Sequence, residues 1–207
     1  MIATHLVRTL DASAASGLVL REGSFHVVAD DENALYVFGP DGDRRCIELL
    51  PGELPDKKSA RKKQKADFEI LVDLPDHGLL AMGSGSRATR ERAVLVDRRE
   101  RTTVIDTSRL CGCLRETFAD LNLEGAALVG DEFVLLQRGN RSDTRSALIF
   151  IAVSDLQQAL VTQHFEVTRA PRMVDLDLGM RDDIPWSCTD LTVLADGDLL
   201  ASAVLEN

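Results

Sequence analysis

One pattern of apolar and polar positions recurs four times along the chain, about every 50 to 65 residues. Each copy has an apolar run, a short turn rich in Asp and Gly, a second apolar run and a polar loop. The paired runs are 16–20 with 25–29, 68–72 with 79–82, 123–129 with 133–136, and 189–194 with 199–203. Asp and Gly tolerate positive φ and therefore suit hairpin turns. A repeat of this length, made of short strands, predicts a β-propeller.

Each complete repeat continues with two more strands of falling hydrophobicity. The third runs are 34–38, 92–96 and 147–151, and the fourth are 45–49, 102–105 and 165–168. Inner strands of a propeller are covered by neighbouring blades and are apolar throughout, whereas outer strands meet solvent. We therefore expect an all-β fold, a single propeller domain over residues 1–207. Its four-stranded blades correspond to repeats at 16–50, 67–107, 122–170 and 188–207.

Two other folds fit this pattern less well. A β-sandwich also has many short strands, but it does not repeat the same order of run, turn and loop. An α/β fold needs long helices between strands, and the best helix candidates here, 110–119 and 154–160, are short. The last repeat stops after its second strand and residues 5–10 form one spare strand. We therefore expect an incomplete arc of about three and a half blades, whose open strand edges favour self-association.

Charge narrows the choice of partners. The net charge is −10, so most of the surface repels nucleic acid. One segment, Lys57–Lys65, is strongly basic. We interpret it as a solvated loop between the first two repeats, with an anion-attracting lip at the channel mouth as the alternative. It contains no aromatic residue on which a base could stack.

Composition also indicates the compartment. No signal-peptide pattern is visible at the N-terminus. The apolar runs are all shorter than the roughly 18 residues of a membrane span. We expect a cytoplasmic protein without membrane partners. The spacing of Cys111 and Cys113 differs from that of a redox or zinc pair, so we expect the four cysteines to be reduced thiols.

Superposing the repeats on their second strands brings equivalent positions into columns. One column contains Asp30, Ser84 and Arg138, and a second contains Glu32, Ser86 and Asn140. A third, at the start of the innermost strands, contains Gly17, Glu69, Glu124 and Asp190. We predict that these positions line the channel.

The acids of the third column suggest a cation site. Equivalent positions of a propeller are related by rotation about its axis, so Glu69, Glu124 and Asp190 should form part of a ring. Repulsion within such a ring is relieved by a cation or an arginine. Hard divalent cations accept oxygen ligands of this kind, and we consider calcium as the cofactor. The alternative is that the three acids cap strand ends.

A second group of residues suggests an anionic ligand. The loop Gly83–Ser86 is followed by Arg87, and Arg138 lies in the equivalent loop of the next repeat. Together these side chains could bind an anionic group, although a flexible strand-end loop is the alternative. No Gly-Lys-Ser/Thr follows, so the loop is not a Walker motif. None of the four histidines falls in the columns, which leaves no Ser-His-Asp triad.

The strand-start motifs resemble those of a known superfamily. Asp67-Phe68-Glu69-Ile70, Leu123-Glu124-Gly125-Ala126 and Thr189-Asp190-Leu191 look like motifs of bacterial phytase-like and esterase-like propellers. The strings 79–86 and 135–140 resemble an uncharacterised branch of that superfamily. The resemblance implies a six-bladed ring whose acidic residues surround a central site that often holds calcium. The dense calcium-ligand strings of phytases themselves are not evident.

Two classes of function therefore remain. The first is a propeller that binds a small anionic ligand or a protein, with a divalent cation at the central channel. The second is a calcium-dependent hydrolase of phosphoesters or carboxylic esters and lactones. The small number of histidines and the absence of an evident general base favour the first class.

Overall fold

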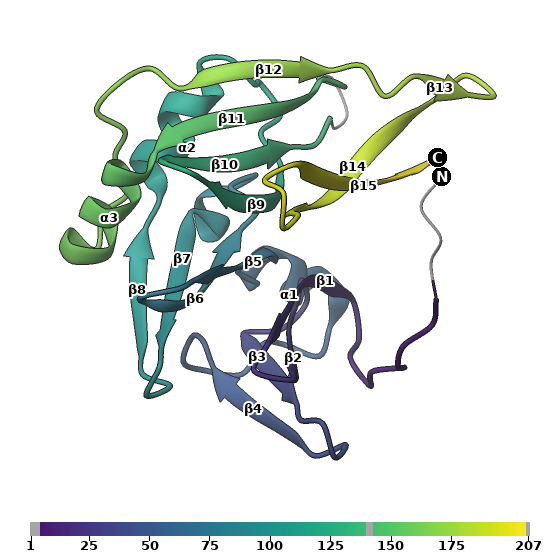
Figure 1. Ribbon diagram of the computed structural model, residues 1–207, viewed down its shortest axis with the longest axis vertical. Coiled ribbons are helices and arrows are strands. Elements are labelled where there is room, and N and C mark those ends of the chain that lie inside the picture. Colours follow the sequence, from purple (N-terminus) through teal and green to yellow (C-terminus); the bar gives the residue numbers. More distant parts are fainter. Residues whose placement is uncertain (1–4, 140–142, 206–207) are drawn as a thin grey trace.

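Four antiparallel sheets follow one another along the chain and surround a common axis (Figure 1). This computed structural model describes residues 5–139 and 143–205. Blade 1 contains β1 (Ala15–Arg21), β2 (Ser24–Ala29), β3 (Ala34–Phe38) and β4 (Arg44–Glu48). Blade 2 contains β5 (Phe68–Leu74), β6 (Gly78–Gly83), β7 (Arg92–Asp97) and β8 (Thr102–Asp106). Blade 3 contains β9 (Leu123–Val129), β10 (Glu132–Gln137), β11 (Ser146–Ala152) and β12 (Arg172–Leu176). The predicted all-β propeller is confirmed.

Blade 4 is smaller than the other three. It contains β13 (Met180–Arg181), β14 (Ile184–Val193) and β15 (Leu199–Leu205). The repeat pattern predicted only the last two of these strands, because a two-residue strand is too short to show an alternation. The described residues thus form four blades, with three strands in the last. The ring of six blades stays a prediction.

The outer strand of blade 3 differs from the predicted one. Residues 165–168 were expected to form it, but the strand is β12, which has charged residues at its first and fourth positions and no fully buried side chain. Phe165 is buried at 1% exposure, and its amide donates to the Asp106 carbonyl oxygen of blade 2 at 2.7 Å. The apolar run therefore anchors the chain against the neighbouring blade.

Three short helices connect the strands. They are α1 (Lys58–Gln64), α2 (Ser108–Arg115) and α3 (Val153–Thr162), and a 3₁₀ turn spans Ala88–Arg90. The last two helices match the predicted candidates. Helix α1 forms where a loop was expected; it contains no buried residue and consists largely of good helix formers. Within the described ranges, no helix is long and apolar enough to span a membrane.

The core lies between consecutive blades. The largest cluster joins blades 2 and 3 and includes Ile70, Leu80, Phe118 and Phe133, all at 0% exposure. Smaller clusters join blade 1 to blade 2 and blade 3 to blade 4. Both faces of the central strands are covered, which explains why β6 is buried along its whole length.

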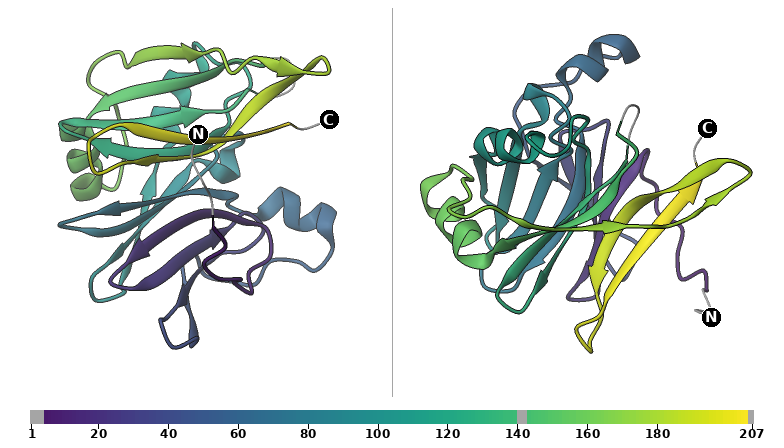
Figure 2. Two further views of the ribbon diagram at one scale, coloured as in Figure 1. Left: turned by 45° about the vertical axis from the view of Figure 1, so that its right-hand side comes forward. Right: turned by 90° about the horizontal axis from the view of Figure 1, so that it is seen from above.

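The first residues described follow the outer face of blade 1. Residues 5–10 were predicted as a spare strand, but they have no strand conformation. Instead Leu10 and Ala12 pack against Val27, Tyr36 and Phe38. This segment covers part of a face that would otherwise meet solvent. Figure 2 shows it running beside blade 1, away from the stacked inner strands.

Candidate functional site

A β-bulge occurs at the same place in the innermost strand of every blade. The strand pairing skips Ser16 in β1, Glu69 in β5, Glu124 in β9 and Thr189 in β14. A bulge leaves one residue unpaired and redirects its side chain. The four bulged residues are therefore equivalent positions around the axis.

This register corrects the predicted acidic column at two positions. Glu69 and Glu124 are equivalent, as expected. In blade 1 the equivalent residue is Ser16 instead of Gly17, and in blade 4 it is Thr189 instead of Asp190. Asp190 follows the bulge, where blades 1 and 3 have Gly17 and Gly125. It does not line the central pocket. Burial raises the pKa of Asp190 to about 6. Superposing the repeats by sequence alone does not locate the bulge. Asp190 was therefore matched with Glu69 and Glu124, although it lies one residue after the equivalent position.

Glu69 and Glu124 interact electrostatically across the interface of blades 2 and 3. Burial raises the pKa of Glu69 to about 8, and the negative charges of Glu124 and Asp67 add to the shift. Glu124 is only 6% exposed. It accepts a hydrogen bond from Asn122 Nδ2 at 2.5 Å, and Arg138 Nη1 lies 3.5 Å from the same oxygen. Glu69 is thus mostly protonated at neutral pH, whereas Glu124 has a cationic neighbour.

Lys65 joins the first two blades at the channel mouth. Its Nζ atom lies 2.6 Å from Asp30 Oδ2 and 2.7 Å from Asp67 Oδ1. Burial alone would lower the pKa of Lys65, but its hydrogen bonds to the two carboxylates raise it above the ordinary value. The basic run 57–65 is therefore exposed along α1, as predicted for a surface segment, and buried at its last residue, which is 9% exposed.

Asp67 is the centre of a buried polar network. It is 4% exposed, and its second oxygen accepts bonds from Arg90 Nη1 and Ser84 Oγ, each at 2.6 Å. Arg90 also donates to Ser86 Oγ at 2.7 Å. Lys65, Arg90 and Ser84 thus share one carboxylate. Charge-assisted bonds of this kind fix geometry as well as adding stability.

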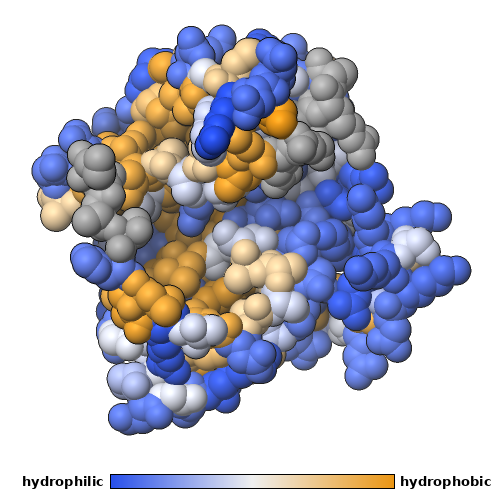
Figure 3. Space-filling view, turned by 90° about the vertical axis from the view of Figure 1, so that its right-hand side faces the viewer, coloured by the Kyte–Doolittle hydropathy of each residue, from blue (hydrophilic) through white to orange (hydrophobic). Residues whose placement is uncertain are grey.

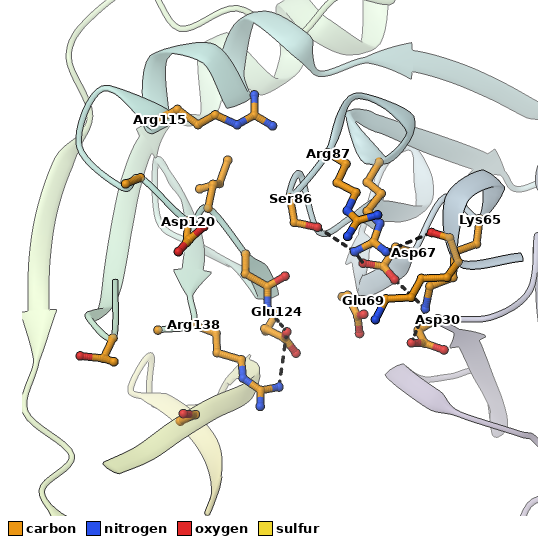
Figure 4. A pocket seen from close by; sticks show the side chains of 18 of the residues that line it. Asp30, Lys65, Asp67, Glu69, Ser86, Arg87, Arg115, Asp120, Glu124 and Arg138 are labelled. Atoms are coloured by element: carbon orange, nitrogen blue, oxygen red, sulfur yellow. Dashed lines mark hydrogen bonds and ion pairs between the residues drawn. The ribbon is translucent and has the colours of Figure 1, made fainter. Parts of the chain in front are cut away.

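These side chains surround a cavity of about 660 Å³ at the mouth of the channel (Figure 4). Blades 1 to 3 provide most of its wall, and Pro185 and Ser187 reach it from blade 4. The charged lining residues are Asp30, Lys62, Lys65, Asp67, Glu69, Arg87, Arg90, Arg115, Asp120, Glu124 and Arg138. The cavity is therefore strongly polar and carries both signs of charge.

The structure brings most of the predicted ligand residues to this cavity. Asp30, Ser86, Arg87 and Arg138 line it, with Arg87 exposed at the rim. Ser84 lies behind the wall at 0% exposure.

Two predicted ligand residues are not found there. Glu32 lines a separate hollow and accepts a hydrogen bond from the Tyr36 hydroxyl. Asn140 lies outside the described residues.

The sequence interpretation missed the residues two positions before each bulge. They are Asp67, Asn122 and Ser187, and all three line the cavity. The residue between each of them and the bulge is buried: Phe68, Leu123 and Cys188. This polar–apolar–polar alternation at the start of each inner strand is the signal that could have identified them.

The acids of this site fit a divalent cation only in part. Asp30, Asp67 and Glu69 have carboxylate oxygens within 4.8 Å of one another, the arrangement that a hard cation needs. However, the Lys65 ammonium already lies between Asp30 and Asp67.

The chain belongs to a family of unknown function (DUF6929), whose model matches residues 11–207. A search of curated protein sequences gives no significant match.

Several solved structures show a distant likeness. Virginiamycin B lyase from Staphylococcus aureus is 10% identical, with a TM-score of 0.49 and coverage of 94% of this chain and 64% of that one. AztD from Citrobacter koseri is 15% identical, with a TM-score of 0.37 and coverage of 94% and 44%. Hydrazine synthase from Kuenenia stuttgartiensis is 11% identical, with a TM-score of 0.43 and coverage of 98% and 59%. The chain spans less than two thirds of the length of each of these structures.

Proposed function

We propose that this propeller binds a small anionic ligand at the channel mouth, together with a divalent cation held between Glu69 and Glu124. One observation carries the proposal. Of the four acids Asp30, Asp67, Glu69 and Glu124, only Glu69 has no lysine or arginine within ion-pair distance among the residues that the structure describes. A half-buried carboxyl with a raised pKa in a polar cavity is a candidate functional group.

The donor chemistry favours calcium. The oxygens of Glu69 and Glu124 are carboxylate ligands, and the Ser16 hydroxyl that bonds Glu69 adds a neutral oxygen. Hard cations select such oxygen-only sets. The resemblance of the strand-start motifs to phytase-like propellers supports the same choice. The four cysteines are unpaired, which suits a reducing compartment such as the cytoplasm.

The anionic part of the ligand would bind beside the cation. Arg138 lies next to Glu124, and Arg87 is exposed at the rim of the same cavity. A bound cation would share the charge of Glu124 with Arg138, and the Arg138 guanidinium would face the ligand from the same side of the cavity. Arginine binds carboxylate and phosphate groups with paired hydrogen bonds.

Calorimetry and thermal melting with calcium test this proposal. At about 100 times its Kd, calcium should stabilise the fold by roughly 2.7 kcal/mol, which raises Tm by about 5–10 °C. Binding at pH 7 should release about one proton, because Glu69 must ionise. Buffers with different ionisation enthalpies measure that proton directly.

Three variants give this test its controls. Glu69→Gln and Glu124→Gln should each remove the calcium response, and Glu69→Gln should also remove the proton release. Glu116→Gln, on an exposed position after α2, should respond like the wild type. An equal calcium response in all four proteins, or none in the wild type, would overturn the cation site.

The hydrolase alternative has less support. Among the described residues that line the cavity there is no histidine. The Ser84 hydroxyl donates its hydrogen bond to Asp67, a carboxylate that Lys65 and Arg90 also bind, and not to an unpaired general base. A screen with chromogenic phosphate and acyl esters tests it. Turnover that depends on calcium and is lost in Glu124→Gln would favour the hydrolase over a binding protein.

A further inference from the structure

A second cleft lies between blades 1 and 2, at the strand ends opposite to the channel mouth. Its volume is about 220 Å³. The innermost strands begin near the channel mouth and end at this cleft, where Arg21 is the last residue of β1. The side of the molecule on which apolar residues gather in and beside a hollow (Figure 3) belongs to the other face of blade 1. The cleft is therefore separate from both the channel mouth and that hollow.

Strand pairing brings three basic side chains of blade 1 to this cleft. His26 is paired with Val19 of β1 and with Val37 of β3, and Val37 is paired with Arg45 of β4. Arg21 follows Val19 by two residues, so it lies on the same face of the sheet. Arg21, His26 and Arg45 all line the cleft.

The floor of the cleft is apolar. It is formed by Leu35 of blade 1 and by Leu79 and Val96 of blade 2, at 0%, 4% and 3% exposure. These side chains belong to the core cluster between the two blades. A hydrocarbon group that entered the cleft would therefore leave water for an apolar surface.

The Arg21 guanidinium has only loose anionic neighbours among the residues that the structure describes. Its side chain is 17% exposed, and Asp73 Oδ1 lies 3.5 Å from its Nη1 atom. Glu22 Oε1 lies 3.9 Å from its Nε atom, but the Glu22 side chain is 87% exposed. Asp73 Oδ1 is buried and has no hydrogen bond within the described ranges. Largely buried polar groups are normally hydrogen-bonded, so Arg21 has unused donors at the cleft.

The carboxylates on the other side of the cleft already have close cationic partners. Glu100 of blade 2 forms an ion pair with Arg45 of blade 1, and Asp97 accepts a hydrogen bond from Arg101 Nε at 2.7 Å. Burial lowers the pKa of His26, and the positive charges of Arg21 and Arg45 lower it further, so its ring is neutral at pH 7.5. The unbalanced charge of the cleft is therefore the positive one of its Arg21 end.

We infer that this cleft binds a small monocarboxylic acid with a short hydrocarbon chain. The carboxylate binds Arg21 through paired hydrogen bonds, the geometry that a guanidinium favours. The hydrocarbon chain lies on Leu35, Leu79 and Val96. A single negative charge suits the cleft better than a phosphate dianion, because three acidic side chains also line it and repulsion grows with charge.

Titration with sodium isovalerate at pH 7.5 and constant ionic strength tests the inference, with the NMR signals of the His26 ring as the readout. These signals should shift in a saturable way, with a Kd on the order of 1 mM for a ligand of this size. The ring signals of His164, which lies outside the cleft and is 63% exposed, should not move. Arg21→Gln should weaken binding about tenfold or more, because it removes charge-assisted hydrogen bonds. Arg99→Gln, at an exposed neighbouring position outside the cleft, should bind like the wild type.

Two further probes and one further variant complete the test. Isovaleramide has the shape of isovalerate without its charge, and inorganic phosphate has charge without a hydrocarbon chain; neither should shift the His26 signals in a saturable way. Arg21→Lys keeps the positive charge next to Asp73 and should bind isovalerate with an affinity between those of the wild type and Arg21→Gln.

Four results would overturn the inference. The first is that isovalerate gives no saturable shift of His26 in the wild type. The second is equal binding by the wild type and Arg21→Gln, and the third is an equal loss in Arg99→Gln, which would show that only the net charge of this region matters. The fourth is that isovaleramide or phosphate binds as tightly as isovalerate, which would exclude a site built for a carboxylate with a hydrocarbon chain.

Discussion

Glu69 and Glu124 occupy the same bulge position in consecutive blades, and both line the channel mouth. Burial, together with the negative charge of Glu124, raises the pKa of Glu69 to about 8. The unfolded chain releases this proton near pH 4.5, whereas the folded protein keeps it. Folding therefore binds a proton between these two pH values.

The free energy of unfolding should consequently fall as the pH rises from about 4.5 to about 8. The stabilisation that comes from the protonated Glu69 side chain is fully present below about pH 4.5 and is lost above about pH 8. Because a tenfold change in proton affinity corresponds to about 1.4 kcal/mol, we expect a loss of roughly 2–4 kcal/mol. Urea titrations at about pH 5, 6.5 and 8 measure it. Glu69→Gln should flatten the profile and be more stable than the wild type at the highest pH. An unchanged slope in this variant would contradict the assignment.

Removing Lys65 should destabilise the contact between blades 1 and 2. Its ammonium group holds Asp30 and Asp67, and Asp67 is buried. The variant Lys65→Ala leaves Asp67 with Arg90 as its one cationic partner among these residues, so we expect a loss of about 3 kcal/mol in the free energy of unfolding. Lys63→Ala, on the exposed face of α1, should change it by less than about 0.5 kcal/mol. Equal effects of the two variants would show that Lys65 contributes no more than a surface lysine.

Adding one methyl group at Gly125 should disturb the interface of blades 3 and 4. The new Cβ would lie 2.6 Å from the Leu191 amide nitrogen and 2.8 Å from the Leu191 Cβ. Overpacking of this kind costs about 1–3 kcal/mol, and thermal melting would show it. Gly112 in α2 provides the matched control, because nothing lies within 4 Å of an added Cβ there. Gly112→Ala should stabilise slightly, by up to about 1 kcal/mol. A Gly125→Ala protein as stable as the wild type would show that the blades can separate at no cost.

The cysteines should react in the order of their burial. Cys46 is exposed, whereas Cys111 and Cys188 are buried. Burial also raises the pKa of Cys111 to about 11, so it holds little thiolate at neutral pH. Alkylation of the native protein at about pH 7.5 should modify Cys46 first and leave Cys111 and Cys188 unmodified until denaturant is added. Early modification of Cys111 would indicate that α2 opens readily from the core.

The amino-acid sequence by itself determined the blades, because strand patterns and turn chemistry are local. The apolar runs and Asp/Gly turns locate β1, β2, β5, β6, β9, β10 and most of blade 4, and the helix pattern locates α2 and α3. It also predicted that Glu69 and Glu124 occupy equivalent positions, since equal positions in a repeat become equal positions around an axis.

Only the tertiary structure decided the register and the electrostatic pairing. The bulges move Asp190 out of the channel and bring Thr189 to the equivalent position. A bulge depends on the pairing of two strands, so no property of one strand shows it. Lys65 is similarly indistinguishable in sequence from its basic neighbours on α1. Its burial against Asp30 and Asp67 exists only because blades 1 and 2 pack side by side.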